Sequence, residues 1–450
     1  MIRGGPAEGK LGVGSLGEEV GRRAPPPILR TRPMAGYLGR PTLPEPPDMA
    51  SVRPFRALRP APEHAEHVAS VPYDVVSVDE AKELASDNEH SFLHVVRPEI
   101  DLPAGTDEHA DAVYDQGAQA LRAFAASDAF VRDEKPRLYV YRLVMNGRAQ
   151  TGVVGLVSAE DYDNDVILKH ENTRPDKEDD RTRHVLAQQA HAEPVMLTYR
   201  GDDDIDAAVA EAMEGEPLYD FRAKDYVQHT VWAIDEPGPL VEAFAELDAL
   251  YVADGHHRSA AAARAARQSD ATDAGHFLAV LFPYEDMEIL AYNRVVKELP
   301  VGKGKFLEQL RRRFEVEEAL FPEPEDFGTV AFYLGLDHGW QTLVLPETER
   351  DGVADTLDVA RLAEFVLEPM LGIADPRTDE NIAFVGGIRG TEELERLVDS
   401  GEADIAFSMF PTSPDELLDV SDAGELMPPK STWFEPKLRS GLLVHTFWDE

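Results

Sequence analysis

The residues best suited to chemistry form the pentapeptide DGHHR at positions 254–258, directly after the apolar run Leu250–Ala253. That run predicts a short buried strand, and the alanine-rich stretch behind the pentapeptide predicts a helix. We expect Asp254 to cap this helix and Gly255 to let the backbone approach a ligand closely. The first free N–H groups and the helix dipole would then attract an anion. An ordinary Asp-Gly turn before a helix is the alternative.

Three side chains at the start of this helix favour phosphate chemistry. Arg258 offers a bidentate fork one turn into the helix, and His256 and His257 add imidazoles beside the free N–H groups. Neighbours on a helix diverge by about 100°, which disfavours a metal ion shared by the two histidines. Asp254 is instead the candidate Mg²⁺ ligand. If only its charge matters, Asp254→Asn lowers turnover and leaves the melting temperature almost unchanged.

A second charged cluster, HENTRPDKEDDR, occupies residues 170–181, where Pro175 prevents one uninterrupted helix. General-base catalysis on a hydroxyl needs a carboxylate or imidazole held beside cations. Glu171 is the candidate base, and Lys177 or Arg181 is the candidate cation beside it. A solvated, salt-bridged helix face is the competing interpretation.

A third segment, MPPKSTWFEPKLRSG (427–441), gathers cations and hydroxyls in one loop of an otherwise acidic protein. This composition favours phosphate binding, although the glycine spacing of a P-loop is absent. A comparable strand-to-helix anion turn, GGIRG (386–390), follows the predicted strand Ile382–Val385. The candidate phosphate-binding residues of the two segments are Lys430, Ser431, Lys437, Arg439 and Arg389.

The elements that must position these residues alternate between strands and helices, which predicts an α+β or mixed α/β fold. Runs rich in β-formers at Arg137–Met145 and Arg148–Val157 flank Asn146-Gly147, the strongest short signal for a hairpin. His276–Phe282 and Met287–Tyr292 are expected to form another antiparallel pair.

The chain divides into three predicted parts. Residues 1–48 are rich in glycine and proline without periodicity, so we expect a disordered extension. Residues 49–300 form an N-terminal α/β domain that carries the HENTRPDKEDDR and DGHHR motifs. Residues 301–450 form a C-terminal α/β domain that carries the GGIRG and MPPKSTWFEPKLRSG motifs.

Charge and composition exclude several classes of protein. The 450 residues include 44 Lys+Arg and 85 Asp+Glu, for a formal net charge of −41. A field of this sign repels nucleic acid and anionic lipid, and no apolar run reaches the roughly 18 residues of a membrane span. The absence of cysteine excludes disulfides and thiolate metal sites. Dispersed acidity suits a salt-rich cytoplasm, so we expect a halophilic, cytoplasmic protein; a mesophilic protein with an acidic interaction face is the alternative.

Taken together, the motifs resemble the domain-of-unknown-function family 1015 from about residue 50 onward. The segments that carry this resemblance are RPFRALRP (53–60), VPYDVVS (71–77), SFLHVVRPEIDLP (91–103), HENTRPDKEDDR (170–181), ADGHHRSAA (253–261), YNRVVKEL (292–299), DPRT (375–378), FVGGIRG (384–390) and MPPKSTWFEPKLRSG (427–441). The family's name assigns it no activity.

The strand–DGHHR–helix unit is also similar to the ParB/sulfiredoxin-like fold, and especially to its free-serine kinases. This resemblance implies a ParB/sulfiredoxin-like catalytic region followed by a second α/β domain. It implies that Asp254, His256, His257 and Arg258 help to hold nucleotide phosphates and that an upstream glutamate is the base. Glu171 is our candidate for that glutamate. ATP or ADP and Mg²⁺ are the implied cofactors.

We therefore predict a nucleotide-dependent kinase or phosphotransferase that acts on a small hydroxylated metabolite, with a serine-like amino acid or its phosphate as the first candidate. The predicted partners are this metabolite and the nucleotide, with neither nucleic acid nor a membrane involved. A ParB-like nucleotide-binding regulatory protein without small-molecule catalysis is one alternative. A phosphatase acting on the same metabolites is another.

Overall fold

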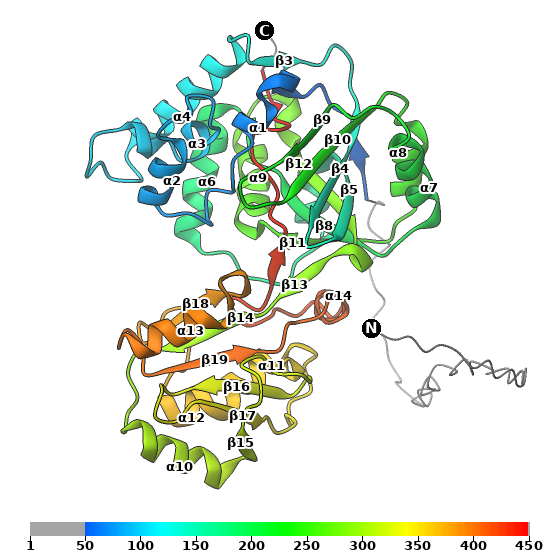
Figure 1. Ribbon diagram of the computed structural model, residues 1–450. Coiled ribbons are helices and arrows are strands. Elements are labelled where there is room, and N and C mark those ends of the chain that lie inside the picture. Colours follow the sequence, from blue (N-terminus) through cyan, green and yellow to red (C-terminus); the bar gives the residue numbers. More distant parts are fainter. Residues whose placement is uncertain (1–49, 449–450) are drawn as a thin grey trace, which may run out of the picture. The chain divides into compact units, whose positions relative to one another are not determined.

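The hairpin predicted around Asn146-Gly147 is present in the computed structural model, which describes residues 50–448 (Figure 1). Strands β4 (Leu138–Met145) and β5 (Arg148–Ser158) pair in antiparallel register. Asn146 and Gly147 have φ values of 52° and 83°, the left-handed pair that a tight hairpin turn of type I′ requires. The disorder expected for residues 1–48 concerns a segment outside the described residues.

A nine-stranded mixed sheet is the framework of the first half of the chain. Its order is β6-β11-β8-β12-β5-β4-β10-β9, and β1 pairs with β5. The remaining members are β1 (Val52–Arg53), β6 (Ile167–Leu168), β8 (Val195–Tyr199), β9 (Tyr219–Arg222), β10 (Gln228–Ile234), β11 (Leu250–Asp254) and β12 (His276–Pro283). The continuous apolar strands β8 and β12 are buried throughout, except for His276. Helix α9 contacts both strands, and Leu442 and Leu443 of the C-terminal segment belong to the same hydrophobic cluster as other side chains of these strands.

The pairing expected between His276–Phe282 and Met287–Tyr292 is wrong. Strand β12 pairs antiparallel with β5 and parallel with β8, while β13 (Glu288–Leu290) pairs with β20 (Trp433–Glu435). A strand so apolar is more stable between two strands at the centre of a sheet than in a local hairpin at its edge.

Helices pack around this sheet and against one another (Figure 1). Helix α6 (Pro175–Gln188) lies between α4 (Asp111–Ala125) and α9 (His256–Gln268), and α7 (Asp203–Ala212) contacts α8 (Gly238–Phe244). Pro175 occupies the first position of α6, where proline favours the start of a helix. The N–H that proline lacks would have no partner within the helix at this position. The shorter helices of this half are α1 (Ala65–Val68), α2 (Val78–Ala85), α3 (Leu93–Val96) and α5 (Ala159–Asp163).

The second half contains a six-stranded antiparallel sheet of order β15-β17-β16-β19-β14-β18. Its strands are β14 (Tyr292–Val296), β15 (Val316–Glu318), β16 (Thr329–Tyr333), β17 (Trp340–Val344), β18 (Ile382–Gly386) and β19 (Ile405–Met409). The helices are α10 (Lys303–Arg313), α11 (Asp358–Leu362), α12 (Glu368–Leu371), α13 (Gly390–Asp399) and α14 (Pro414–Asp422), with a π-helical segment at Ala363–Leu367.

The last residues return to the first half of the chain. After β20 pairs with β13, β21 (His445–Thr446) pairs with β7 (Ala190–His191), beside the small ladder of β2 (Leu58–Pro60) and β3 (Phe130–Arg132). This return carries the 427–441 segment to the start of α9, far away in sequence.

The described residues form a mixed α/β structure, so the predicted fold class is confirmed. One large hydrophobic cluster includes side chains from both sheets. The contacts group these residues into one unit, and the boundary near residue 300 stays a prediction. No helix within residues 50–448 has the length and apolar character needed to cross a membrane.

Candidate functional site

The DGHHR motif is a strand–turn–helix unit, as predicted. Strand β11 ends at Asp254, and α9 begins at His256. The residue between them, Gly255, is the helix cap and has a φ of 99°, which glycine adopts without the steric cost of a side chain. The cap expected at Asp254 is wrong: Asp254 still belongs to the strand, where it pairs with Met196.

The Asp254 carboxylate is held between two cations. Its Oδ2 accepts hydrogen bonds from Arg258 Nη2 and from Lys437 Nζ, both at 3.4 Å. Burial opposes ionisation, but Lys437 and Arg258 outweigh it and hold the pKa of this carboxyl well below its usual range. Asp254 thus joins the DGHHR motif to the 427–441 segment through charge.

Two motif side chains point into the protein rather than towards solvent. The His256 ring packs against buried His170, with centroids 4.3 Å apart, and burial lowers the pKa of His170 to about 4. Arg258 is also buried and donates to the carbonyl oxygen of Pro194 as well as to Asp254. His256 and Arg258 therefore lie in the protein interior, where they fix the start of α9 through their contacts with His170, Pro194 and Asp254.

A cavity of about 770 Å³ lies at the outer side of this helix start, and Glu171 and Lys430 both line it. Burial raises the pKa of the Glu171 carboxyl, although the ammonium and backbone N–H of Lys430 oppose this rise. For Lys430, the neighbouring Tyr292 and Glu171 raise the ammonium pKa against the effect of burial. The candidate base thus lines the same cavity as a cation that influences its pKa.

Further cations and one motif histidine line the same cavity. His257 Nε2 accepts the backbone N–H of Arg174 at 3.0 Å, which leaves Nδ1 to carry the proton of the neutral ring. Burial, followed by Lys430, lowers the pKa of His257. Lys177 in the first turn of α6 brings positive charge to the wall that contains Glu171, whereas the neighbouring Arg174 pairs with Asp176 at 2.9 Å.

Lys430 has a backbone conformation that the surrounding residues must enforce. Its φ is 59°, a left-handed value that costs a non-glycine residue free energy. Arg294 Nη2 donates to the Lys430 carbonyl at 3.0 Å, and the Lys430 ammonium lies 5.5 Å from the centroid of the Tyr292 ring. Arg294 is buried, and within residues 50–448 its hydrogen bonds go to carbonyl oxygens. Burial lowers its pKa to about 9.

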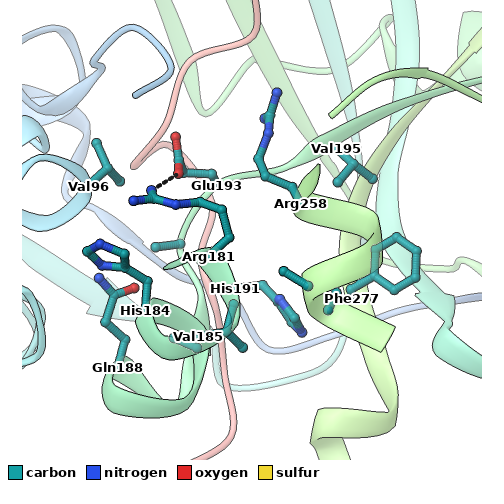
Figure 2. Close-up of a pocket in the computed structure, with 14 residues that line it drawn as sticks. Val96, Arg181, His184, Val185, Gln188, His191, Glu193, Val195, Arg258 and Phe277 are labelled. Atoms are coloured by element: carbon teal, nitrogen blue, oxygen red, sulfur yellow. Dashed lines mark ion pairs between the residues drawn. The ribbon is translucent and has the colours of Figure 1, made fainter. Parts of the chain in front are cut away.

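Arg181 belongs to a separate buried cluster (Figure 2). It pairs with Asp180 at 2.6 Å and with Glu193 at 3.7 Å, and its guanidinium lies 3.8 Å from the Tyr73 ring centroid. The space that Arg181, Glu193 and Arg258 enclose is about 40 Å³, enough for about one water molecule. Arg181 therefore does not reach the large cavity.

The four remaining residues predicted to bind phosphate lie in different parts of the structure. Lys437 pairs with Asp254, and the Ser431 hydroxyl donates to the Pro428 carbonyl at 2.7 Å within its own loop. Arg439 is buried, and its guanidinium donates to His229 and Asp225. Arg389 is exposed at the start of α13. The structure brings none of these four to the wall of the large cavity.

Sequence reasoning missed the wall that the second half of the chain contributes. Phe384 on β18 and Asp375 and Arg377 in the preceding loop line the cavity, and Arg294 and Tyr292 support it from β14. The segments YNRVVKEL, DPRT and FVGGIRG contain all five residues, but the one chemical pattern among them, the GGIRG turn, pointed to Arg389 and to none of these five.

Residues 50–448 contain no magnesium site built from protein side chains alone. Among them, no group of three or more histidine, aspartate or glutamate side chains is placed to share a metal ion. Asp254, the candidate ligand, already neutralises two cations that would repel a third.

A family model described as "Protein of unknown function (DUF1015)" matches residues 52–360. No curated protein matches the sequence. Among solved structures, a conserved hypothetical protein from Pyrococcus furiosus is similar at 16% identity and a TM-score of 0.34, over 65% of this chain and 95% of that one.

Two further solved structures are similar at the same low level. SbnI with a C-terminal truncation, from Staphylococcus aureus, is 14% identical with a TM-score of 0.36, over 65% of this chain and 87% of that one. A free serine kinase in complex with AMP is 14% identical with a TM-score of 0.34, over 64% of this chain and 92% of that one. Similarities at these TM-scores carry no functional argument, so any proposed function depends on the residues of the cavity.

Proposed function

The chain belongs to the DUF1015 family of proteins of unknown function, and from the chemistry of its large cavity we propose that it is a nucleotide-dependent phosphotransferase. The acceptor is a small hydroxylated metabolite, with a serine-like amino acid as the first candidate. The donor is ATP or ADP.

The observation that supports this proposal is that Glu171 and Lys430 line one cavity and that each influences the pKa of the other. A general base works best when its pKa lies near the working pH, and burial moves the pKa of Glu171 in that direction. Lys430 opposite it is raised in pKa and stays charged, so it can neutralise the phosphoryl oxygens. Phosphoryl transfer needs chiefly positioning and charge neutralisation, which such a pair supplies.

The reaction assigns a separate task to each group. The Glu171 carboxylate accepts the proton of the substrate hydroxyl as the hydroxyl oxygen bonds to the terminal phosphorus. The bond between that phosphorus and its bridging oxygen breaks, and the shortened nucleotide leaves with the electron pair. Lys430 and Lys177 neutralise the phosphate oxygens, and His257 Nδ1–H and the free N–H groups of α9 donate hydrogen bonds to them.

The test compares Glu171→Gln with the wild-type protein in molar potassium chloride. Transfer of radiolabelled phosphate to L-serine should fall by about 10²–10⁴-fold, since the amide cannot accept the proton. Nucleotide affinity should not fall, because the lost negative charge leaves Lys430 more available to phosphate. Glu108→Gln, which alters an exposed residue outside the cavity, is the matched control and should retain full turnover. Full turnover in Glu171→Gln would remove the base from the mechanism.

A second variant separates binding from proton transfer. Lys430→Met removes a cation and leaves the base, so it should weaken nucleotide affinity and raise KM more than it lowers kcat. A Lys430→Met protein with unchanged affinity would show that the phosphate lies elsewhere.

A further inference from the structure

The large cavity has an apolar wall in addition to its charged one. Ile382 and Phe384 are two residues apart on β18, so both project from the same face of the strand, and both line the cavity. Ile382 is buried and Phe384 is half-buried. Met427 and Pro428 line the cavity as well. A slot of this kind suits a flat, apolar group.

The Phe384 ring is held in place from the neighbouring strand. Arg294 on β14 lies directly opposite Phe384 in the antiparallel register, and its guanidinium is 5.5 Å from the ring centroid. The Tyr292 ring meets Phe384 in a T-shaped contact at 6.1 Å. A platform supported in this way loses little conformational freedom when a ligand stacks on it.

The apolar wall and the charged wall meet at Tyr292. Its ring contacts Phe384 and also lies 5.5 Å from the Lys430 ammonium. A ligand on Phe384 therefore has a cation and the base Glu171 within reach along the same cavity. Asp355 and Asp379 also line this cavity and offer carboxylate acceptors for an amino group.

We propose that Phe384 is the stacking platform for the base of the nucleotide and that Ile382 and Met427 complete its slot. This inference rests on the proposed function, because the slot is matched to the donor whose phosphates lie at Lys430. The second half of the chain thus supplies the nucleobase slot and the phosphate ligand Lys430, and the slot favours a nucleotide over pyrophosphate or a longer polyphosphate. The first half supplies the general base Glu171 and the phosphate ligands Lys177 and His257.

The test uses calorimetric titration with ADP and with inorganic pyrophosphate, the same anionic group without a nucleoside. Base–aromatic stacking contributes about 1–3 kcal/mol per base. Phe384→Ala should therefore weaken ADP binding by about 5- to 150-fold and leave pyrophosphate binding unchanged. Phe384→Tyr keeps the ring and should retain ADP affinity, which separates loss of stacking from loss of folding. Phe321→Ala, which removes an exposed phenylalanine outside the cavity, is the matched control.

Four outcomes would overturn the inference. ADP affinity that survives Phe384→Ala, or pyrophosphate affinity that falls with it in parallel, rejects the platform and leaves the phosphotransferase proposal standing. Wild-type protein that binds ADP no more tightly than pyrophosphate rejects a base subsite anywhere in the cavity. Wild-type protein that binds neither ligand rejects the proposed function itself.

Discussion

The Asp254→Asn substitution has two different predicted effects, one from the DGHHR sequence pattern and one from the contacts of the Asp254 carboxylate. From the sequence, Asp254 is a helix cap and a catalytic carboxylate, so the substitution lowers turnover and spares stability. In the structure Gly255 is the cap, and the Asp254 carboxylate compensates Arg258 and Lys437 at 3.4 Å each. The contacts therefore predict that stability is lost first.

The magnitude follows from what the substitution leaves behind. Asparagine keeps an oxygen acceptor but no charge, so two cations with little exposure lose their counter-ion. Hydrogen bonds to charged groups contribute about 1.5–3 kcal/mol, and breaking a buried ion pair costs about 3–5 kcal/mol. The Asp254 side chain retains 28% exposure, which reduces the higher figure. We expect the free energy of unfolding to fall by about 2–4 kcal/mol.

Urea unfolding at constant molar salt measures this loss. Asp248→Asn, in the loop before β11, makes the same chemical change at an exposed residue and should alter stability by less than about 0.5 kcal/mol. A double-mutant cycle with Lys437→Met should show coupling of at least about 1 kcal/mol. If Asp254→Asn unfolds at the same urea concentration as the wild-type protein, the contacts of Asp254 with Arg258 and Lys437 do not stabilise the fold. The sequence-based prediction that Asp254 is catalytic would then be favoured.

Three other perturbations have outcomes that the structure defines. Burial lowers the folded-state pKa values of His170 and His445 to about 4, so below pH 6.5 the unfolded chain binds more protons than the folded protein. The free energy of unfolding should therefore fall by about 3 kcal/mol for each histidine as the pH drops from 6.5 to 4. Urea melts whose stability does not change over this pH range would contradict this. A Cβ at Gly386 would lie 2.6 Å from the Trp433 ring, so Gly386→Ala should cost about 1–3 kcal/mol by thermal unfolding, whereas Gly238→Ala has open space and should cost little. With a net charge of −41, the folded state should become less stable as salt is diluted to tens of millimolar, because the repulsion between its negative charges is no longer screened. A circular dichroism signal that does not change on dilution would show that the acidic surface is not adapted to high salt.

Local chemistry made part of the fold predictable. The turn at Asn146-Gly147 needs two left-handed residues in succession, which this dipeptide favours. The DGHHR pentapeptide separates a short apolar run from an alanine-rich run, so both elements follow from short-range rules. Glu171 and Lys430 were recognised separately because each is a charged residue in an unusual sequence context. Both line one cavity, although they are far apart in sequence; β20, which follows Lys430 directly, is held by its pairing with β13.

The rest depends on contacts between residues distant in sequence. Strand β13 pairs with β20 rather than with its neighbour β12, a choice that no local pattern encodes. Arg439 and Lys437 are two residues apart, yet Arg439 pairs with Asp225 and Lys437 pairs with Asp254, and no local sequence pattern predicts which acid each of them meets. The platform at Phe384 is invisible in sequence because a half-exposed phenylalanine on a strand resembles any other.

The most direct test of the phosphotransferase is the identity of the phosphorylated product. Phosphorus NMR would follow ATP and ADP with L-serine, L-threonine or L-homoserine, and with L-alanine as the acceptor that lacks a hydroxyl. We predict a phosphomonoester signal that grows in step with the loss of nucleotide for a hydroxylated acceptor, is absent with alanine, and falls by about 10²–10⁴-fold in Glu171→Gln. Inorganic phosphate as the sole product with every acceptor, or transfer that persists in Glu171→Gln, would contradict the account.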